Sequence, residues 1–300
     1  MTKTPFSPAQ DSYLFDRKVV RKHRERAVGI DWSRHGFLFA EVADRMADRL
    51  LDITRTYDLA LDLGCRGGAF ADALRARSLA STVIQADLAF GHVAETGGDR
   101  SVVADEEFLP FAPASFDLVG SVLNLHWTND LPGALVQIAR SLKPDGLFLG
   151  SLFGIESLQE LKWCLTQAES EVSGGVHPRI SPFTEVRDAG GLLQRAGLAL
   201  PVTDVDTVTL KYSDPFALMR ELRGMGEGNA LVQRQKTLTG RRVLFRAAEL
   251  YMENFADEDG LIPATFQIIY MTGWSPHASQ QEPARRGSGQ ASLTDILSKD

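Results

Sequence analysis

The stretch LALDLGCRGG, residues 59–68, joins an apolar run to a glycine-rich turn. Residues 57–63 have the pattern of a short buried strand, and residues 69–77, after the turn, have a helical pattern. Glycines let the backbone approach a ligand closely, and the N-terminus of a helix offers free N–H groups. A strand, a glycine turn and a helix in this order predict a cofactor site. The dinucleotide pattern G-x-G-x-x-G does not fit, because Arg66 stands at its second glycine.

Acidic residues follow the next two predicted strands. Asp87 comes 19 residues after Gly68, at the end of a strand over 83–86, where a carboxylate can accept both hydroxyls of an adenosine ribose. Asp105 follows a strand over 100–104 and is placed to meet the rim of an adenine. Each acid taken alone is equally well explained as a surface residue. The glycine turn and these two acids are three features at successive strand ends, and together they favour a nucleoside-containing cofactor.

Apolar runs and helical patterns alternate through the first half of the chain. Strands separated by helices predict right-handed crossovers and a mostly parallel sheet with helices on both faces. Lys143-Pro144-Asp145-Gly146 is expected to end the helix before the fifth strand. The other predicted strands cover 116–123, 146–153, 208–212 and 264–274, and the other predicted helices cover 131–142, 157–172, 184–196 and much of 214–260.

The chain is expected to have three parts. A basic helical segment covers 1–45, an α/β domain covers 46–274 with a helical insertion at about 213–262, and residues 275–300 form a disordered tail. The basic segment has two interpretations: a solvated helix face, which is the simpler one, or a docking surface for an acidic partner. Its charged residues are Arg17, Lys18, Arg21, Lys22, Arg24 and Arg26, against Asp16 and Glu25.

Composition excludes several classes of protein. Hydrophobic residues make up 44% and charged residues 24%, which is typical of a globular chain, and the net charge of −7 argues against a nucleic-acid partner. Cys65 and Cys164 are too few for a disulfide framework or a four-ligand zinc site, which indicates a reducing compartment. The most apolar stretch, 147–155, is shorter than the about 20 residues that a bilayer requires. Without an apolar signal core at the N-terminus, we expect a cytoplasmic protein.

Candidate catalytic residues follow the fourth strand in NLHWTND, residues 124–130, at the edge where open α/β sheets bind ligands. They are Asn124, His126 and Trp127. His126 is interpreted as a base, a hydrogen-bonding anchor or a core histidine with its bonds satisfied, and Trp127 as a pocket wall.

Candidate substrate contacts lie in and after the loop before the sixth strand. Loop residues of mixed charge with an aromatic suit a substrate, although the charged pair at 187–188 is equally well explained as solvating a helix. The six histidines are scattered without metal-ligand spacing, so no metal site is predicted. The candidate contacts are His177, Arg179, Phe183, Arg187 and Asp188.

Several motifs resemble those of class I S-adenosylmethionine-dependent methyltransferases: LDLGC-x-GG at 61–68, ADEEFLPF at 104–111, SFDLVGS at 115–121 and LKPDG at 142–146. Over residues 13–290 the chain is similar to the bacterial form of the complex I (NADH:ubiquinone oxidoreductase) assembly factor 5 family. More distantly it resembles the malonyl-carrier-protein methyltransferases of biotin synthesis. The more specific strings are LFDRKVVRKHRERA at 14–27, SPFTEVRDAGGLLQRAG at 181–197, GMGEGN at 224–229 and PATFQIIYMTGWSPHASQ at 263–280.

The resemblance implies a Rossmann-like, seven-stranded sheet whose last strand is antiparallel and inserted beside the fifth. It also implies S-adenosylmethionine as the cofactor. Asp62 would orient the turn and the methionine amino group, and Asp87 would hold the ribose. The remaining implied cofactor contacts are Gly64, Cys65, Arg66, Gly67 and Gly68 in the turn, Leu88 after Asp87, and Asp105 and Glu106 at the adenine.

Arg66 departs from the pattern of the resembling family, whose turn usually reads G-C-G-x-G. A side chain at this position could crowd the cofactor, or strain the backbone if a positive φ is needed. Alternatively, Gly67 adopts the unusual dihedral and Arg66 swings out to meet the cofactor carboxylate. We favour adaptation of the turn over loss of cofactor binding.

The resemblance leaves three functions open. The fold implies methyl transfer, whereas the assembly factor family is associated with hydroxylation of an arginine in the complex I iron–sulfur subunit beside the quinone site. The third function is a non-catalytic chaperone for that subunit. In each case the implied partner is the iron–sulfur subunit, and any association with the inner face of the membrane would occur through it.

Overall fold

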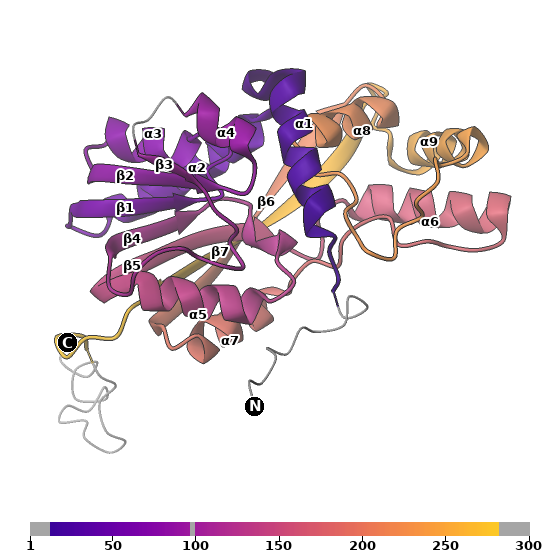
Figure 1. Cartoon of the computed structure of the whole chain (residues 1–300). Coiled ribbons are helices and arrows are strands. Elements are labelled where there is room, and N and C mark those ends of the chain that lie inside the picture. Colours follow the sequence, from indigo (N-terminus) through magenta and orange to yellow (C-terminus); the bar gives the residue numbers. More distant parts are fainter. Residues whose placement is uncertain (1–12, 97–99, 282–300) are drawn as a thin grey trace, which may run out of the picture.

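The computed structural model describes residues 13–96 and 100–281. At its centre is a seven-stranded sheet in the order β3-β2-β1-β4-β5-β7-β6 (Figure 1). The chain is thus an α/β protein, as the sequence predicts. The strands are β1 (Tyr57–Leu63), β2 (Ala80–Asp87), β3 (Ser101–Val103), β4 (Phe116–Ser121), β5 (Leu142–Phe153), β6 (Ala199–Tyr212) and β7 (Ile262–Trp274).

Strand directions confirm the predicted topology. β1 pairs in parallel with β2 and β4, and β4 pairs in parallel with β5. β7 lies between β5 and β6 and pairs antiparallel with both. The carboxyl ends of β1, β2 and β4 consequently meet at one edge, where this type of sheet binds ligands.

Helices cover both faces of the sheet. Figure 1 shows α5 and α7 together below it, while α2, α3 and α4 lie above and the insertion helices lie at one side. In β1 the side chains alternate between two cores, because Ala60 packs with α2 and α3 whereas Leu61 packs with α5 and α7. The helices are α1 (Arg17–His35), α2 (Phe37–Leu51), α3 (Ala69–Ala76), α4 (Phe90–Glu95), α5 (Leu131–Ser141), α6 (Gln159–Ser173), α7 (Val186–Arg195), α8 (Pro215–Gly224) and α9 (Arg241–Phe255).

Several boundaries differ from the sequence-based expectations, and the largest difference is at β6, which begins at Ala199 rather than Val208. β5 begins at Leu142 rather than Gly146, because Leu142 already pairs with Phe116 of β4 before a shift in register. The expected boundary at residue 45 falls inside α2, whose apolar face packs in the same core as β1. Of the expected tail, residues 282–300 lie outside the described residues.

None of the helices in the described part of the chain combines the length and apolar composition that a membrane-spanning segment requires.

Candidate cofactor and substrate site

The glycine turn after β1 has an unusual backbone. Gly64, Gly67 and Gly68 have φ values of 75°, 87° and 91°, which glycine adopts without steric cost. Arg66 also has a positive φ, 42°, where a side chain is strained. Both features considered from the sequence are therefore present: Gly67 adopts the unusual dihedral, and the backbone is strained at Arg66.

Side chains of the protein itself approach the turn closely. A Cβ on Gly67 would lie 2.5 Å from Nε1 of Trp32 in α1, and a Cβ on Gly64 would lie 2.1 Å from Cγ of Asn124. Such distances are shorter than any real contact, so glycine is required at both positions. The turn is thus covered by α1 and by the loop that follows β4.

Asp87 ends β2 and is buried beside the turn. Its carboxylate accepts the backbone N–H groups of Arg66 at 3.3 Å and Ala89 at 2.8 Å. Nη1 of Arg24 lies 3.5 Å from Asp87 Oδ1, and Nη2 of Arg24 donates to Glu106 at 2.9 Å. The acids predicted at the ribose and adenine positions therefore share one buried arginine from α1.

A second arginine of α1 extends this network. Nη2 of Arg17 lies 2.6 Å from Asp105 Oδ1 and 3.0 Å from Glu106 Oε2. Burial alone would raise the pKa of Glu106, but the charges of Arg24 and Arg17 outweigh it and lower this pKa to about 2. Glu106 is therefore ionised at neutral pH.

The basic residues of the N-terminal segment are thus divided between the buried site and the surface. For Arg17 and Arg24, both the solvated-face and the docking-surface interpretation are wrong, because their side chains point into the site. Of the six basic residues predicted in this segment, Lys18, Arg21 and Lys22 are exposed.

Several buried polar atoms around the turn have no hydrogen-bond partner within the described residues. Such atoms are costly unless a ligand satisfies them. Burial also raises the pKa of Asp62 to about 7, and a cofactor ammonium beside it would restore its charge. Together, the unpaired donor and acceptor atoms around the turn suit the amino, carboxylate and ribose groups of S-adenosylmethionine. The unpaired atoms belong to Asp62 (Oδ1), Asn124, Gln85 (Nε2), Arg24 (Nε and Nη1), Arg66 (Nε), His92 and His126 (Nδ1).

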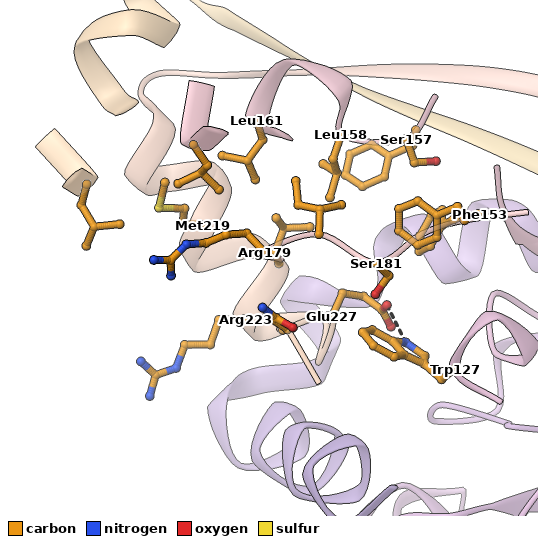
Figure 2. Close-up of a pocket in the computed structure, with 18 residues that line it drawn as sticks. Trp127, Phe153, Ser157, Leu158, Leu161, Arg179, Ser181, Met219, Arg223 and Glu227 are labelled. Carbon is orange, nitrogen blue, oxygen red and sulfur yellow. Dashed lines mark hydrogen bonds between the residues drawn. The ribbon is translucent and has the colours of Figure 1, made fainter. Parts of the chain in front are cut away.

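Glu227, in the loop after α8, joins the candidate catalytic residues. Its Oε2 accepts the indole N–H of Trp127 at 2.8 Å (Figure 2). The same oxygen lies 3.1 Å from His126 Nε2, and Oε1 accepts from Arg66 Nη2 at 3.0 Å. Nη1 of Arg66 donates to the carbonyl of Met225 at 3.1 Å. Arg66 therefore swings away from the turn toward Glu227.

The ionisation of this cluster follows from its charges. Burial alone would raise the pKa of Glu227, but the charge of Arg66 and the hydrogen bonds from His126 and Trp127 outweigh it and lower this pKa to about 2. Burial lowers the pKa of His126 below its ordinary value, although the hydrogen bond to Glu227 opposes this shift. At neutral pH the cluster thus holds a carboxylate and a neutral imidazole.

A cavity of about 240 Å³ opens beside this cluster. Figure 2 shows Glu227 and Trp127 at one end and the apolar side chains of Leu161 and Met219 at the other. Phe153 forms part of the wall, with its ring 4.9 Å from that of His126. The cavity combines apolar walls with one buried carboxylate and two arginines, Arg179 and Arg223, and a few polar groups among apolar walls are the usual composition of a ligand pocket.

The structure brings only part of the predicted substrate set to this cavity. Arg179 and Phe183 line it, and Arg179 is held by an ion pair with Glu169. His177 lies in an adjoining pocket of about 450 Å³. Arg187 and Asp188, in the first turn of α7, are exposed and line a separate depression.

Sequence reasoning missed Glu227, Trp32 and the inward direction of Arg24. Glu227 stands in GMGEGN, one of the family-like strings, so a signal for it was present. Trp32 and Arg24 lie in a segment whose charge pattern suits a solvated helix equally well.

Comparisons with known proteins agree with this geometry. The methyltransferase domain family matches residues 61–150, which contain the turn, Asp87 and Glu106. A Bacillus halodurans protein assigned to the methyltransferases superposes with a TM-score of 0.54 at 17% identity, covering 77% of this chain and 99% of its own. The YcgJ protein of Bacillus subtilis gives the same TM-score at 16% identity, covering 78% and 99%. The fold and the site define an enzyme of the S-adenosylmethionine-dependent methyltransferase class, with S-adenosylmethionine as its cofactor.

Within that class, the chain belongs to the NDUFAF5 family. It is 44% identical over 296 residues to the mitochondrial arginine-hydroxylase NDUFAF5 of Danio rerio, covering 97% of this chain and 92% of the relative. The human protein of the same name is 45% identical, with coverages of 94% and 83%. A malonyl-[acyl-carrier protein] O-methyltransferase of Methylovorus is 37% identical, with coverages of 89% and 92%.

Proposed function

We propose that this protein modifies an arginine side chain of a protein partner during assembly of respiratory complex I. The observation that carries the proposal is Glu227, a buried carboxylate at the wall of an aromatic cavity beside the cofactor turn. A guanidinium suits such a cavity, because it pairs with a carboxylate and lies favourably over aromatic faces. Glu227 already accepts Arg66 in this way, and each carboxylate oxygen has two lone pairs.

The adjoining pocket favours a protein substrate over a free metabolite. Arg179 and Ile180 line both pockets, and the outer one is also lined by the exposed side chains of Tyr13, Leu14 and Val176. A peptide lying along the outer pocket could insert one long side chain toward Glu227. Given the resemblance described above, the proposed partner is the iron–sulfur subunit next to the quinone site. The enzyme would then act in the cytoplasm, at the inner face of the membrane.

Hydroxylation is the reaction we favour. Five relatives between 37% and 45% identical to this chain are named arginine-hydroxylases. In that reaction one atom of dioxygen is inserted into a C–H bond of the arginine. The other atom leaves as water, with two electrons and two protons from an external donor.

Methyl transfer is the second candidate, supported by His126. When bound, S-adenosylmethionine supplies an activated methyl group. A guanidinium nitrogen must lose a proton to accept it, and His126 is a neutral imidazole whose Nε2 is oriented by Glu227 at 3.1 Å. His126 would hold that proton while Glu227 stabilises the resulting charge.

Reconstitution distinguishes these reactions. The purified protein is incubated with the purified iron–sulfur subunit, an electron donor, and either labelled dioxygen or a methyl-labelled cofactor. Hydroxylation predicts one labelled oxygen on a single arginine, and methyl transfer predicts labelled methyl there with release of S-adenosylhomocysteine. Glu227→Gln should abolish either label, whereas the exposed Arg187→Ala should retain it. A subunit of unchanged mass would refute both reactions and leave the chaperone.

A further inference from the structure

We propose that helix α1 forms part of the cofactor site and that Arg24 donates hydrogen bonds to the adenosine part of S-adenosylmethionine. Arg24 lies outside residues 61–150, which the methyltransferase domain family matches. This inference rests on the cofactor and not on the proposed arginine substrate. A binding assay can therefore support or overturn it whatever the reaction is.

The Arg24 side chain is fully buried between the two acids of the adenosine side. Nη2 donates to Glu106 at 2.9 Å, whereas Nη1 stops 3.5 Å from Asp87. Nη1 and Nε have no hydrogen-bond partner among the described residues. Because a guanidinium carries five N–H donors, Arg24 has buried donors left over beside the two acids. Unpaired buried donors of this kind call for a ligand with acceptor oxygens or nitrogens.

An adenosine supplies such acceptors at this place. Asp87 stands at the end of β2, where it can accept the O–H groups of a ribose. A hydroxyl that donates to Asp87 keeps lone pairs on its oxygen, and Arg24 is the adjacent donor. The acid and the arginine thus complement the two sides of one hydroxyl group. The charge of Arg24 also balances Asp87 and Glu106, two buried acids that would otherwise repel each other.

Trp32 gives independent evidence that α1 covers the site. Its indole nitrogen lies only 2.5 Å from the position that the Cβ of any residue other than glycine would take at position 67, and its ring is 4.7 Å from that of His92. The helix is interrupted just before it, at Asp31, with φ of 139°. A cofactor that approaches the backbone of the glycine turn must displace this indole. Cofactor binding should therefore change how α1 packs against the glycine turn.

The first experiment measures S-adenosylhomocysteine binding to the full chain by calorimetry. Arg24→Lys keeps the positive charge between the acids but loses the planar set of donors. We expect about tenfold weaker binding of both S-adenosylhomocysteine and adenosine. Arg21→Lys is the matched control, because Arg21 lies on the same helix with its side chain 55% exposed, and it should bind as the wild type does. Wild-type affinity in a folded Arg24→Lys variant would overturn the proposal.

A second experiment does not depend on the stability of that variant. Amide hydrogen exchange is measured on the wild-type chain with and without S-adenosylhomocysteine. If α1 closes on the adenosine, the amides of Arg17–His35 should exchange more slowly in the complex, together with those of the glycine turn. Protection of the glycine turn with unchanged exchange in α1 would show that α1 is not part of the site.

Discussion

Replacing Glu227 by glutamine should destabilise the protein strongly. The substitution removes the negative charge from a buried cluster in which Arg66 is only 1% exposed and Glu227 5% exposed. Breaking a buried ion pair from one side costs about 3–5 kcal/mol, because the remaining charge stays unpaired. The glutamine oxygen can still accept from Arg66, and the Met225 carbonyl continues to do so. We therefore expect a loss near the lower end, about 3 kcal/mol in the free energy of unfolding.

A double-mutant cycle tests the origin of that loss. Urea unfolding is followed by circular dichroism for Glu227→Gln, Arg66→Met and the double variant. If the two side chains stabilise each other, the double variant should lose less than the sum of the single losses, with a coupling of about 2 kcal/mol. Glu253→Gln is the control, since Glu253 pairs with Arg246 on the surface at 3.5 Å with 58% exposure and should change stability by less than about 1 kcal/mol. A loss no larger than the control, or a coupling near zero, would refute the reasoning.

Three further predictions concern binding and turnover. Asp87→Ala should weaken S-adenosylmethionine binding about tenfold or more in calorimetry, because it removes the acceptor at the end of β2. Unchanged affinity would contradict the assignment of Asp87 as the residue that holds the ribose. Burial raises the pKa of Asp62 to about 7, and a bound ammonium favours its ionised form. Cofactor affinity should therefore fall as the pH drops from 7 to 5, by up to about tenfold per unit, and Asp62→Asn should remove this slope. Phe183→Ala should slow modification of the partner about tenfold, because it opens the cavity beside His126. Arg187→Ala, in a separate depression, should leave the rate unchanged. Equal effects of the two substitutions would show that the cavity is not the substrate site.

Local patterns were sufficient to predict the framework of the site. The strand before Gly64 and the helix after Gly68 are short-range features, and parallel pairing brings the ends of β1 and β2 together whatever the intervening sequence. Asp87 could therefore be placed from its position at a strand end, whereas the role of Asp62 was predicted from resemblance. The antiparallel β7 was predicted from resemblance, because periodicity alone gives no strand direction.

Contacts between distant segments could not be predicted in the same way. Glu227 reaches His126 across 101 positions of sequence, and Arg24 reaches Glu106 across 82. The helical pattern of α1 gives its periodicity but not which acids lie opposite its arginines. The local turn signal at Lys143-Pro144-Asp145-Gly146, by contrast, was predicted correctly: α5 ends at Ser141, and these four residues lie in the register shift of β5, where Asp145 has φ of 62°.

The most direct test of the account is the mass of the iron–sulfur subunit in cells. Complex I is isolated from cells with the intact gene, from cells lacking it, and from lacking cells that express Glu227→Gln. If this protein hydroxylates the subunit, one arginine should carry an added oxygen only in the complex from cells with the intact gene. The same modified arginine in cells that lack the gene would contradict the account, as would an unmodified subunit in all three.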